Sequence, residues 1–379
     1  MKTLDSYDFK GKKVLLRTDY NVPIKNGEVL DSFRIKESMK TIKELFRKGA
    51  KQIIIITHLG RPNGRDPQLK LDPLVKPLIK LSGRSIEKHD DCLEVEHLIG
   101  SSSIVLLENL RFYDEEEKDD EIFASKLAKL ADVFVNDAFG VSHRKHASVH
   151  AITKFLPSVA GRLVEKELNI FNEVLTLPKK PFVAIIGGSK LETKLSVIQN
   201  LINKVDNLLL GGAMIFTFFA AKNFSVGKSL VDKKSFAMAT MLMNNEKLVL
   251  PKDVVIADSM ESPSQIVNVL PSQIPSYMYG LDIGQKSVDE FKDILLSANT
   301  IIWNGPLGYY ENPLFAKATV GLLKFLADSN KKVIIGGGDT AALVTQLGLK
   351  DKFYHVSTGG GASLKLLEGK GLVALEALK

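Results

Sequence analysis

The sequence predicts an α/β protein with two Rossmann-like, doubly wound parallel-sheet domains joined by a helix and hinge. Two observations lead to this prediction. Short apolar, β-branched segments alternate with helical patterns along the whole 379-residue chain, and strands of this kind suit parallel sheets that are buried on both faces. The length also exceeds the roughly 250–300 residues at which a single hydrophobic core stops growing.

Apolar segments predicted as strands occur in both halves of the chain. They are Lys13–Arg17, Gln52–Thr57, Ile104–Glu108 and Asp132–Asn136, then Phe182–Ile186, Asn207–Leu210, Val254–Ile256, Thr300–Trp303, Lys332–Ile335 and Tyr354–Ser357. The helical run Gly161–Leu175 precedes a proline-flanked break at Thr176–Pro181, which predicts a helix connecting two domains. Ligands of such sheets bind beyond the carboxyl ends of the strands, so motifs that follow strands are the most informative about function.

Composition restricts the class of protein. With 45% hydrophobic and 25% charged residues, the chain resembles soluble globular proteins. No apolar run approaches the roughly 20 residues of a membrane span, and acidic residues occupy Met1–Asp8, where a signal peptide needs an apolar core. We therefore expect a cytoplasmic protein. The single cysteine, Cys92, excludes an intrachain disulfide and argues against structural zinc.

The net charge of +7 admits nucleic acid, acidic membranes or small anions as partners. Lysines are scattered through amphipathic segments such as Met39–Lys48 and Glu121–Leu130, as on solvated helix faces. Several arginines instead occur in short turn-like motifs. This distribution favours a compact anion site over a long basic track.

The segment Lys332–Val344 predicts a strand, a tight glycine turn and a helix. Gly336, Gly337 and Gly338 let the backbone approach an anion, and the N–H groups at a helix start favour negative charge. Asp339 would repel a bare phosphate there unless a divalent cation lies between them, which indicates a magnesium nucleotide. The alternative is an ordinary turn followed by an N-cap residue.

Other glycine-rich turns follow strands of the second half. Gly187–Lys194 is predicted to enter a helix with Lys190 and Lys194 one turn apart on the same face, where a polyphosphate would offset their repulsion. The segment lacks the Walker spacing, and surface lysines beside a turn are the alternative. Gly211–Ala213 would accept a flat ring or form only a tight turn, and Glu311 occupies a position from which it could bind ribose hydroxyls.

In the first half, arginines occur in four loops that follow strands. The polar residues of these loops are Asp19, Asn21 and Arg34, His58 and Arg61, Arg111, and His143 and Arg144. A single arginine after a strand is usually a solvated loop residue, but four such loops predict a cationic basin for phosphate and carboxylate groups. Asp19 and Asn21 would accept hydrogen bonds from substrate hydroxyls. The alternatives are a turn or cap role for Asp19 and a structural role for His58.

One half thus offers an arginine basin and the other a nucleotide cradle. A kinase of small anionic molecules fits this combination, because phosphoryl transfer depends mostly on positioning and charge neutralisation. A rival class is a nicotinamide-dependent oxidoreductase, but Arg17–Pro23 lacks the Gly-x-Gly-x-x-Gly turn that it needs. A second rival is a basic nucleic-acid-binding protein, which strong salt-dependent retention on DNA would favour.

Several motifs occur together in the order of a known family. They are Arg17–Pro23, His58–Pro62, Leu106–Phe112, Asn136–Arg144, Gly187–Lys194, Trp303–Gly308, Gly336–Ala341 and Val356–Ser363. With this ordered set, essentially the whole chain resembles the phosphoglycerate kinase family. The resemblance implies a monomeric, cytoplasmic transferase of glycolysis, without nucleic-acid or membrane partners. Its reaction would be reversible in-line transfer of the acyl phosphate of 1,3-bisphosphoglycerate to ADP, giving 3-phosphoglycerate and ATP, with Mg²⁺ and after hinge closure.

The resemblance also implies a domain organisation. Residues 1–160 would form an N-terminal 3-phosphoglycerate-binding domain, and 161–176 an interdomain helix. Residues 177–365 would form a C-terminal nucleotide-binding domain, and 366–379 a C-terminal segment that returns to the N-terminal domain.

Individual residue roles are implied by matching positions. The resemblance assigns Asp19, Asn21, Arg34, His58, Arg61, Arg111 and Arg144 to substrate binding, Arg34, Lys190 and Lys194 to catalysis, Lys194, Glu311, Gly337, Gly338, Asp339 and Thr340 to the nucleotide, and Asp339 to the metal. The chain departs from the family's usual residues at Arg162, Ser189 and Ala213. Because Ala213 belongs to the presumed purine floor, the purine preference stays open.

Overall fold

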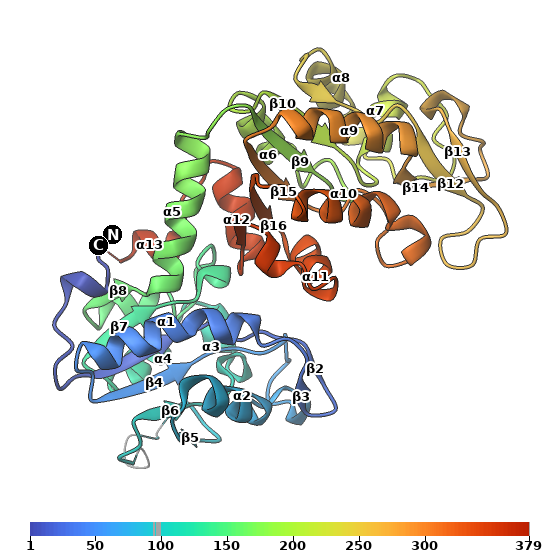
Figure 1. The fold of residues 1–379 in the computed structure, drawn as a ribbon. Coiled ribbons are helices and arrows are strands. Elements are labelled where there is room, and N and C mark those ends of the chain that lie inside the picture. Colours follow the sequence, from blue (N-terminus) through green and yellow to red (C-terminus); the bar gives the residue numbers. More distant parts are fainter. Residues whose placement is uncertain (94, 96–99, 379) are drawn as a thin grey trace. The chain divides into compact units, whose positions relative to one another are not determined.

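The computed structural model describes residues 1–93, 95 and 100–378 (Figure 1). The chain forms two compact units: unit 1 consists of Met1–Asn169 with Gly371–Lys379, and unit 2 of Ile170–Lys370. The division falls inside helix α5 (Arg162–Thr176). Among the described residues, no helix combines the length and apolar character needed to traverse a bilayer.

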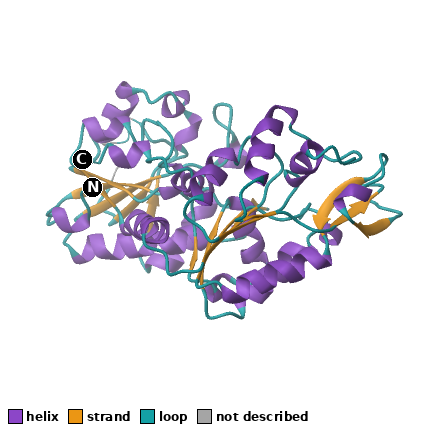
Figure 2. Ribbon diagram, turned by 90° about the horizontal axis from the view of Figure 1, so that it is seen from above, coloured by secondary structure: helices purple, strands orange, loops and turns teal. Residues whose placement is uncertain are grey.

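A six-stranded parallel sheet forms the centre of unit 1, in the order β5-β6-β4-β1-β7-β8. Its strands are β1 (Lys13–Arg17), β4 (Gln52–Ile56), β5 (Ile86–Lys88), β6 (Ile104–Leu106), β7 (Val133–Asn136) and β8 (Ser158–Ala160). Helices lie on both sides of the strands (Figure 2), which explains why β4 is buried along its whole length. Arg17 of β1 pairs with Ile56 of β4 and Asn136 of β7, so the carboxyl ends of these three strands are level.

The helices of unit 1 form where apolar residues recur with helical spacing. They are α1 (Phe33–Arg47), α2 (Asp72–Ser82), α3 (Asp114–Glu117), α4 (Glu121–Ala128) and α13 (Val373–Glu376), and a hairpin of β2 (Ile24–Lys25) and β3 (Glu28–Val29) precedes α1. Helix α1 buries Ile35, Met39 and Ile42 against the sheet side of unit 1. Its first N–H, that of Phe33, donates to Oδ1 of Asp31 (2.9 Å). This start places Arg34 in the first turn of α1.

The C-terminal segment belongs to unit 1. The N–H of Ala374 donates to the carbonyl oxygen of Ser142 (3.1 Å), and Ala374 packs in a buried cluster with Ala138, Val141 and Val149. The end of the chain therefore covers the loop that follows β7.

A second six-stranded parallel sheet forms the centre of unit 2, in the order β11-β10-β9-β15-β16-β17. Its strands are β9 (Phe182–Ile186), β10 (Asn207–Leu210), β11 (Leu248–Val249), β15 (Thr300–Asn304), β16 (Lys332–Gly336) and β17 (His355–Val356). The helices of unit 2 are α6 (Leu195–Ile202), α7 (Ile215–Ala221), α8 (Phe236–Met243), α9 (Gln285–Ser297), α10 (Lys317–Ala327), α11 (Gly338–Gln346) and α12 (Gly360–Leu367). The predicted class of two doubly wound parallel-sheet domains is thereby confirmed.

One predicted strand forms, but in an antiparallel sheet and not in the parallel sheet that was expected. Val254–Ile256, expected in a parallel sheet, lies in β12 (Val254–Ala257), which pairs antiparallel with β13 (Ile266–Val269) and β14 (Tyr279–Ile283). The connection 258–265 between β12 and β13 is shorter than the dozen or more residues of a parallel crossover. Most of β13 is exposed, as a small antiparallel sheet allows and a doubly covered parallel sheet does not.

Candidate active site

In unit 1, the predicted basin residues lie beyond the carboxyl ends of parallel strands. Asp19 follows β1, His58 follows β4, and Arg111 lies in a single 3-10 turn after β6. Arg144 follows β7, and Arg34 lies in the first turn of α1. The loops of parallel strands leave a sheet at the same edge, so these side chains share one end of unit 1.

Asp19 links several of the predicted substrate residues. Its Oδ2 lies 2.6 Å from Nη1 of Arg34, and its Oδ1 lies 4.0 Å from Nε2 of His58. The N–H of Asn21 also donates to Oδ1 of Asp19 (3.3 Å), while the side-chain Oδ1 of Asn21 accepts from the N–H of Gly60 (2.9 Å). Asp19 and Asn21 therefore tie the loops after β1 and β4 together and hold Arg34.

The buried imidazole of His58 lies among four arginines whose positive charges act on it. Burial, followed by the positive charges of Arg17, Arg111, Arg34 and Arg144, lowers the pKa of His58 well below its usual value. The imidazole is 2% exposed. Because the ring is neutral at neutral pH, it offers one hydrogen-bond donor and one acceptor without adding charge to the basin.

Glu117, the last residue of α3, contacts two of these arginines. Its Oε1 lies 3.2 Å from Nε of Arg111 and 4.0 Å from Nη1 of Arg144. Arg144 also donates from Nε to Nε2 of His143 (3.4 Å). Sequence reasoning missed Glu117, although an acidic run directly after the arginine loop was a visible signal. The carboxylate occupies a position that suits an anionic ligand.

Arg61 and Arg111 share a cavity of about 290 Å³. The side chain of Arg111 is fixed there because its Nη1 donates to the carbonyl oxygen of Gly60 (2.5 Å). Arg61 is exposed, and the other charged residues that line the cavity are Asp114, Glu117 and Lys118. The volume lies near the lower end of the range of small-ligand sites, about 300–1,000 Å³.

Arg17 is a buried part of this site to which sequence reasoning gives no role. It is the last residue of β1 and is 1% exposed. Its Nε donates to Oγ of Ser148 (2.8 Å), and its Nη2 lies 3.6 Å from Oε1 of Glu116 and 3.4 Å from Nδ1 of His58. A buried guanidinium needs such partners. Arg17 therefore positions His58 from the buried side of the site.

In unit 2, the predicted phosphate turn connects β16 to α11. Gly337 has φ = 85°, a left-handed conformation that glycine adopts without strain, and α11 begins at Gly338. Asp339 lies in the first turn, and the buried Oγ1 of Thr340 accepts from the N–H of Gly305 (2.9 Å). The N–H groups and positive dipole end of α11 suit an anion at this turn.

Lys190 and Lys194 do not lie on one helix face, so that prediction was wrong. Helix α6 begins only at Leu195, with Lys194 as its N-cap residue. The backbone of Gly188, with φ = 155°, is incompatible with a helix, and a turn follows in which the N–H of Lys194 donates to the carbonyl oxygen of Leu191 (2.8 Å). The glycines thus delay the helix start beyond both lysines.

Lys194 is nevertheless directed towards the phosphate turn. Its Nζ donates to Oδ1 of Asn304 (2.7 Å), and burial lowers its pKa while the charge of Asp339 raises it. Nδ2 of Asn304 is buried and finds no hydrogen-bond partner in the part of the chain that the structure describes. A Cβ added to Gly337 would lie 3.3 Å from this nitrogen. Asn304, which sequence reasoning missed, therefore offers a donor beside the turn.

A cavity of about 420 Å³ adjoins this turn. Gly212 and Ala213 line it together with the apolar side chain of Leu281, and Glu311 and Asp339 line it as well. Its volume falls within the range of small-ligand sites, about 300–1,000 Å³. Apolar surface with a few carboxylates is suited to a flat base and a ribose.

Tyr310 also lines this cavity. Burial, followed by the charges of Asp339 and Glu311, raises the pKa of Tyr310 to about 12. The phenol therefore keeps its proton at neutral pH.

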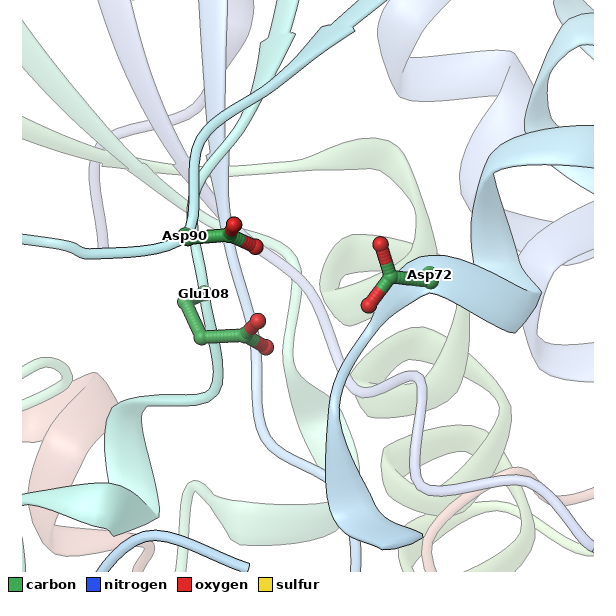
Figure 3. Close-up of side chains that lie close together, drawn as sticks. All are labelled: Asp72, Asp90 and Glu108. Carbon is green, nitrogen blue, oxygen red and sulfur yellow. The ribbon is translucent and has the colours of Figure 1, made fainter. Parts of the chain in front are cut away.

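Two places offer carboxylates to a cation. Asp72, Asp90 and Glu108 in unit 1 have ligand oxygens within 4.8 Å of one another (Figure 3). The ammonium group of Lys88 lies 3.2, 2.5 and 2.8 Å from them, and Lys88 and Lys70 lower the pKa of Asp90 to about 2. The ammonium group of Lys88 thus already pairs with all three carboxylates. Asp339, at the glycine turn, supplies the hard oxygen ligand that Mg²⁺ prefers.

A family model described as phosphoglycerate kinase matches residues 4–370. A phosphoglycerate kinase of Dictyoglomus turgidum is 46% identical over 385 residues, which cover 98% of this chain and 96% of that protein. A cytosolic phosphoglycerate kinase of Triticum aestivum is 48% identical, covering 99% and 97%. A chloroplastic phosphoglycerate kinase 2 of Arabidopsis thaliana is 50% identical, covering 98% and 82%.

Solved structures show the same likeness. The phosphoglycerate kinase of Coxiella burnetii superposes with a TM-score of 0.86 at 32% identity, covering 99% of this chain and 98% of that one. The enzyme of Pyrococcus horikoshii gives a TM-score of 0.86 at 29% identity, covering 100% and 98%.

Proposed function

The chain belongs to the phosphoglycerate kinase family, and from this premise we propose which of its side chains carry out the reaction. The protein is a phosphotransferase of glycolysis that reversibly transfers the acyl phosphate of 1,3-bisphosphoglycerate to ADP, giving 3-phosphoglycerate and ATP. The observation that carries our assignment is the convergence of Arg17, Arg34, Arg111 and Arg144 on the neutral imidazole of His58.

Unit 1 binds the phosphoglycerate in this proposal. Arg61, Arg111 and Arg144 pair with its phosphate and carboxylate oxygens, for which planar guanidinium groups are well shaped. His58 and Asn21 contact the three-carbon chain or its oxygens as neutral groups. Two supporting observations are the shared cavity of Arg61 and Arg111 and the way in which Glu117 already engages two of the arginines.

Unit 2 binds the nucleotide. Gly337, Gly338 and Thr340 place backbone N–H groups around the phosphates, Glu311 binds the ribose, and Asp339 holds Mg²⁺. When bound, Mg²⁺ neutralises negative charge on the nucleotide phosphates. These residues fit the ion because Asp339 adjoins both the cavity and the glycine turn.

The transfer step is assigned to Arg34, Lys190 and Lys194. Their positive charges stabilise the phosphoryl group as it moves in line between the acyl oxygen and the terminal nucleotide oxygen. Because one set of ligands belongs to unit 1 and the other to unit 2, we propose that the hinge at α5 closes when both substrates bind. Solution scattering should show compaction with both ligands together, and an unchanged radius of gyration would contradict closure.

Calorimetry on paired variants tests the two half-sites. Arg144→Ala should weaken 3-phosphoglycerate binding at least tenfold and leave the dissociation constant of magnesium ADP within twofold. Asp339→Ala should weaken binding of magnesium ADP at least tenfold and leave the dissociation constant of 3-phosphoglycerate within twofold. The exposed residues Arg84 and Asp328 provide controls with the same charge changes, Arg84→Ala and Asp328→Ala. Equal weakening of both ligands by Arg144→Ala or Asp339→Ala would indicate damage to the fold and would refute the assignment.

We also propose that the protein works as a cytoplasmic monomer without nucleic-acid or membrane partners. Support for the location comes from a relative named cytosolic, that of Triticum aestivum, although relatives from Arabidopsis thaliana include chloroplastic proteins. Light scattering of the purified protein with and without substrates measures the oligomeric state directly, and a dimer mass would contradict the proposal.

A further inference from the structure

Arg65 contacts Tyr113 in the wall of the cavity that Arg61 and Arg111 share, and the proposed reaction gives it no role. We propose that Arg65 positions Arg61 for 3-phosphoglycerate by fastening the loop that carries Arg61 to Asp91 and Tyr113. This inference rests on the proposed function, because it assumes that Arg61 binds the substrate. It adds to that function a residue that acts through another and does not itself contact the ligand.

Three loops of unit 1 meet at the side chain of Arg65. Arg65 lies in the loop after β4, Asp91 follows β5, and Tyr113 directly follows the 3-10 turn that carries Arg111. Nη2 of Arg65 donates to Oδ2 of Asp91 (2.5 Å) and to the hydroxyl oxygen of Tyr113 (2.8 Å). The hydroxyl of Tyr113 in turn donates to Oδ1 of Asp91. The three side chains therefore close a ring of hydrogen bonds that ties the three loops together.

The guanidinium group of Arg65 is occupied by protein partners. Its bonds to Asp91 and Tyr113 use both N–H groups of Nη2, and Nη1 donates to the carbonyl oxygen of Asp90 (3.1 Å). Its Cζ also lies 5.5 Å from the centre of the Tyr113 ring. An arginine has five N–H donors, and Arg65 uses three of them within the protein. This arrangement suits a residue that holds a loop better than one that binds a ligand.

The partners of Arg65 are fixed by contacts of their own. Oδ1 of Asp91 accepts from the backbone N–H groups of the next two residues (2.7 and 3.1 Å). The ring of Tyr113 packs against that of Phe123 in α4, with 5.3 Å between the ring centres, and Phe123 is buried. Arg65 is therefore attached to side chains that are themselves held in place.

The loop that carries Arg61 has one attachment at each end. At its start, the N–H of Gly60 donates to Oδ1 of Asn21 (2.9 Å), and Arg65 supplies the second attachment. Gly64, directly before Arg65, has φ = 77°, a left-handed conformation at a residue whose backbone is unusually free in the absence of other restraints. Loss of the second attachment leaves Arg61 to be ordered by the ligand, and that ordering lowers affinity.

Arg65→Met tests this role, because methionine keeps an unbranched side chain and removes every donor. Positioning an anchoring residue before the ligand binds favours the ground state and the transition state equally. We expect the KM for 3-phosphoglycerate to rise about fivefold, with kcat at saturation and the dissociation constant of magnesium ADP within about twofold of wild type. Arg65→Lys keeps the charge but replaces the planar fork with a single ammonium group, so KM should still rise about threefold.

Matched variants separate positioning from a general loss of charge. Arg84→Met makes the same change at an exposed arginine whose Cζ lies 4.1 Å from the centre of the Phe46 ring. Arg84 is absent from the cavity lining, and this variant should leave KM unchanged. Asp91→Asn weakens the ring of hydrogen bonds from its other side and should raise KM as Arg65→Met does. In the Arg61→Ala background, Arg65→Met should change KM by less than about twofold, because it acts through Arg61.

The results distinguish failure of this inference from failure of the function on which it rests. If Arg61→Ala raises KM and Arg65→Met leaves it at the wild-type value, the positioning role is refuted and the substrate assignment stands. If Arg61→Ala leaves KM unchanged, the assignment of Arg61 fails, and the inference fails with it. If Arg65→Met has its full effect in the Arg61→Ala background, or if Arg65→Lys retains the wild-type KM, Arg65 acts on the ligand through its charge. Either result refutes the positioning role.

Discussion

Nη1 of Arg34 lies 2.6 Å from Oδ2 of Asp19, and the two side chains are 27% and 6% exposed. The arginine proposed to stabilise the transferring phosphoryl group is therefore already oriented by a carboxylate before any ligand binds. A bidentate guanidinium has further N–H donors that remain free for a second anion. Preorganisation of this kind reduces the reorganisation needed at the moment of reaction.

Arg34→Ala is expected to bind both substrates within a few-fold of wild type and to turn over very slowly. Loss of a positioned donor that meets developing charge typically lowers kcat by about 10²–10³, so kcat and kcat/KM should fall together. Steady-state assays at saturating substrate measure this directly. A kcat within threefold of wild type, combined with weaker 3-phosphoglycerate binding, would show that Arg34 only anchors the substrate.

Arg61→Ala should show the opposite pattern. The Arg61 side chain is exposed at the cavity that it shares with Arg111, which suits an anchoring contact made equally in the ground state and the transition state. Loss of such a contact raises KM and leaves kcat largely unchanged. The same assay with 3-phosphoglycerate varied checks this expectation, which a large fall in kcat at saturation would contradict.

Glu117→Gln is expected to strengthen binding of 3-phosphoglycerate. Glu117 contacts Arg111 and Arg144 at 3.2 and 4.0 Å, so it competes with an anionic ligand for their charge. Its side chain is 53% exposed, and an exposed pair of this kind contributes only about 0.2–1 kcal/mol. The dissociation constant should therefore fall about 1.4- to 5-fold at low salt. Glu115→Gln, an exposed neighbour on α3, makes the same charge change away from these contacts, and an equal effect there would indicate a long-range field.

Asp137→Asn tests a buried acid at the start of α5. Burial raises the pKa of Asp137 to about 7, although hydrogen bonds from Thr41 and from the N–H groups of Leu163 and Val164 act in the opposite direction. The unfolded chain loses this proton near the ordinary aspartate pKa of about 3.9. Between pH ~4 and 7 the folded state therefore binds more protons at Asp137 than the unfolded state does. The contribution of Asp137 to the free energy of unfolding falls as the pH rises through that window.

An asparagine cannot titrate, so the wild type minus Asp137→Asn difference in the unfolding free energy of unit 1 should decrease from pH 5 to pH 7. The slope is at most about 1.4 kcal/mol per pH unit, and the difference should be level above pH 7. Urea-dependent hydrogen exchange of β1 and β7 reports on unit 1 directly. A difference that is constant from pH 5 to pH 8 would mean that the acid is already ionised at pH 5.

The alternation of apolar strands and helices was sufficient to predict both sheets, and the segments Lys13–Arg17, Phe182–Ile186 and Asn207–Leu210 have the bounds of β1, β9 and β10. The strand ends could be recognised because a doubly covered strand is apolar along its length and its first polar residue marks the edge of the sheet. The convergence of arginine loops follows from parallel topology.

Other features depend on neighbours that are remote in sequence. Arg17 and Asn304 are polar residues at strand ends that are buried beneath the site. Their burial depends on partners that are distant in sequence, such as Glu116 for Arg17 and Lys194 for Asn304. The start of α6 depends on the conformation of Gly188, which a helical spacing of lysines does not reveal. Tyr310 and Asp339 line the same cavity, and no local pattern brings these residues together.

The covering of the loop after β7 by Ala374 has a consequence for biosynthesis. Unit 1 is discontinuous, and its last segment begins at Gly371, after the whole of unit 2. At about 5–20 residues per second, the ribosome needs roughly 10–40 seconds to make Ile170–Lys370. During that interval the nascent first unit leaves Ala138, Val141 and Val149 without the side chain that completes their cluster. The first part of the protein to be synthesised is thus among the last to be finished.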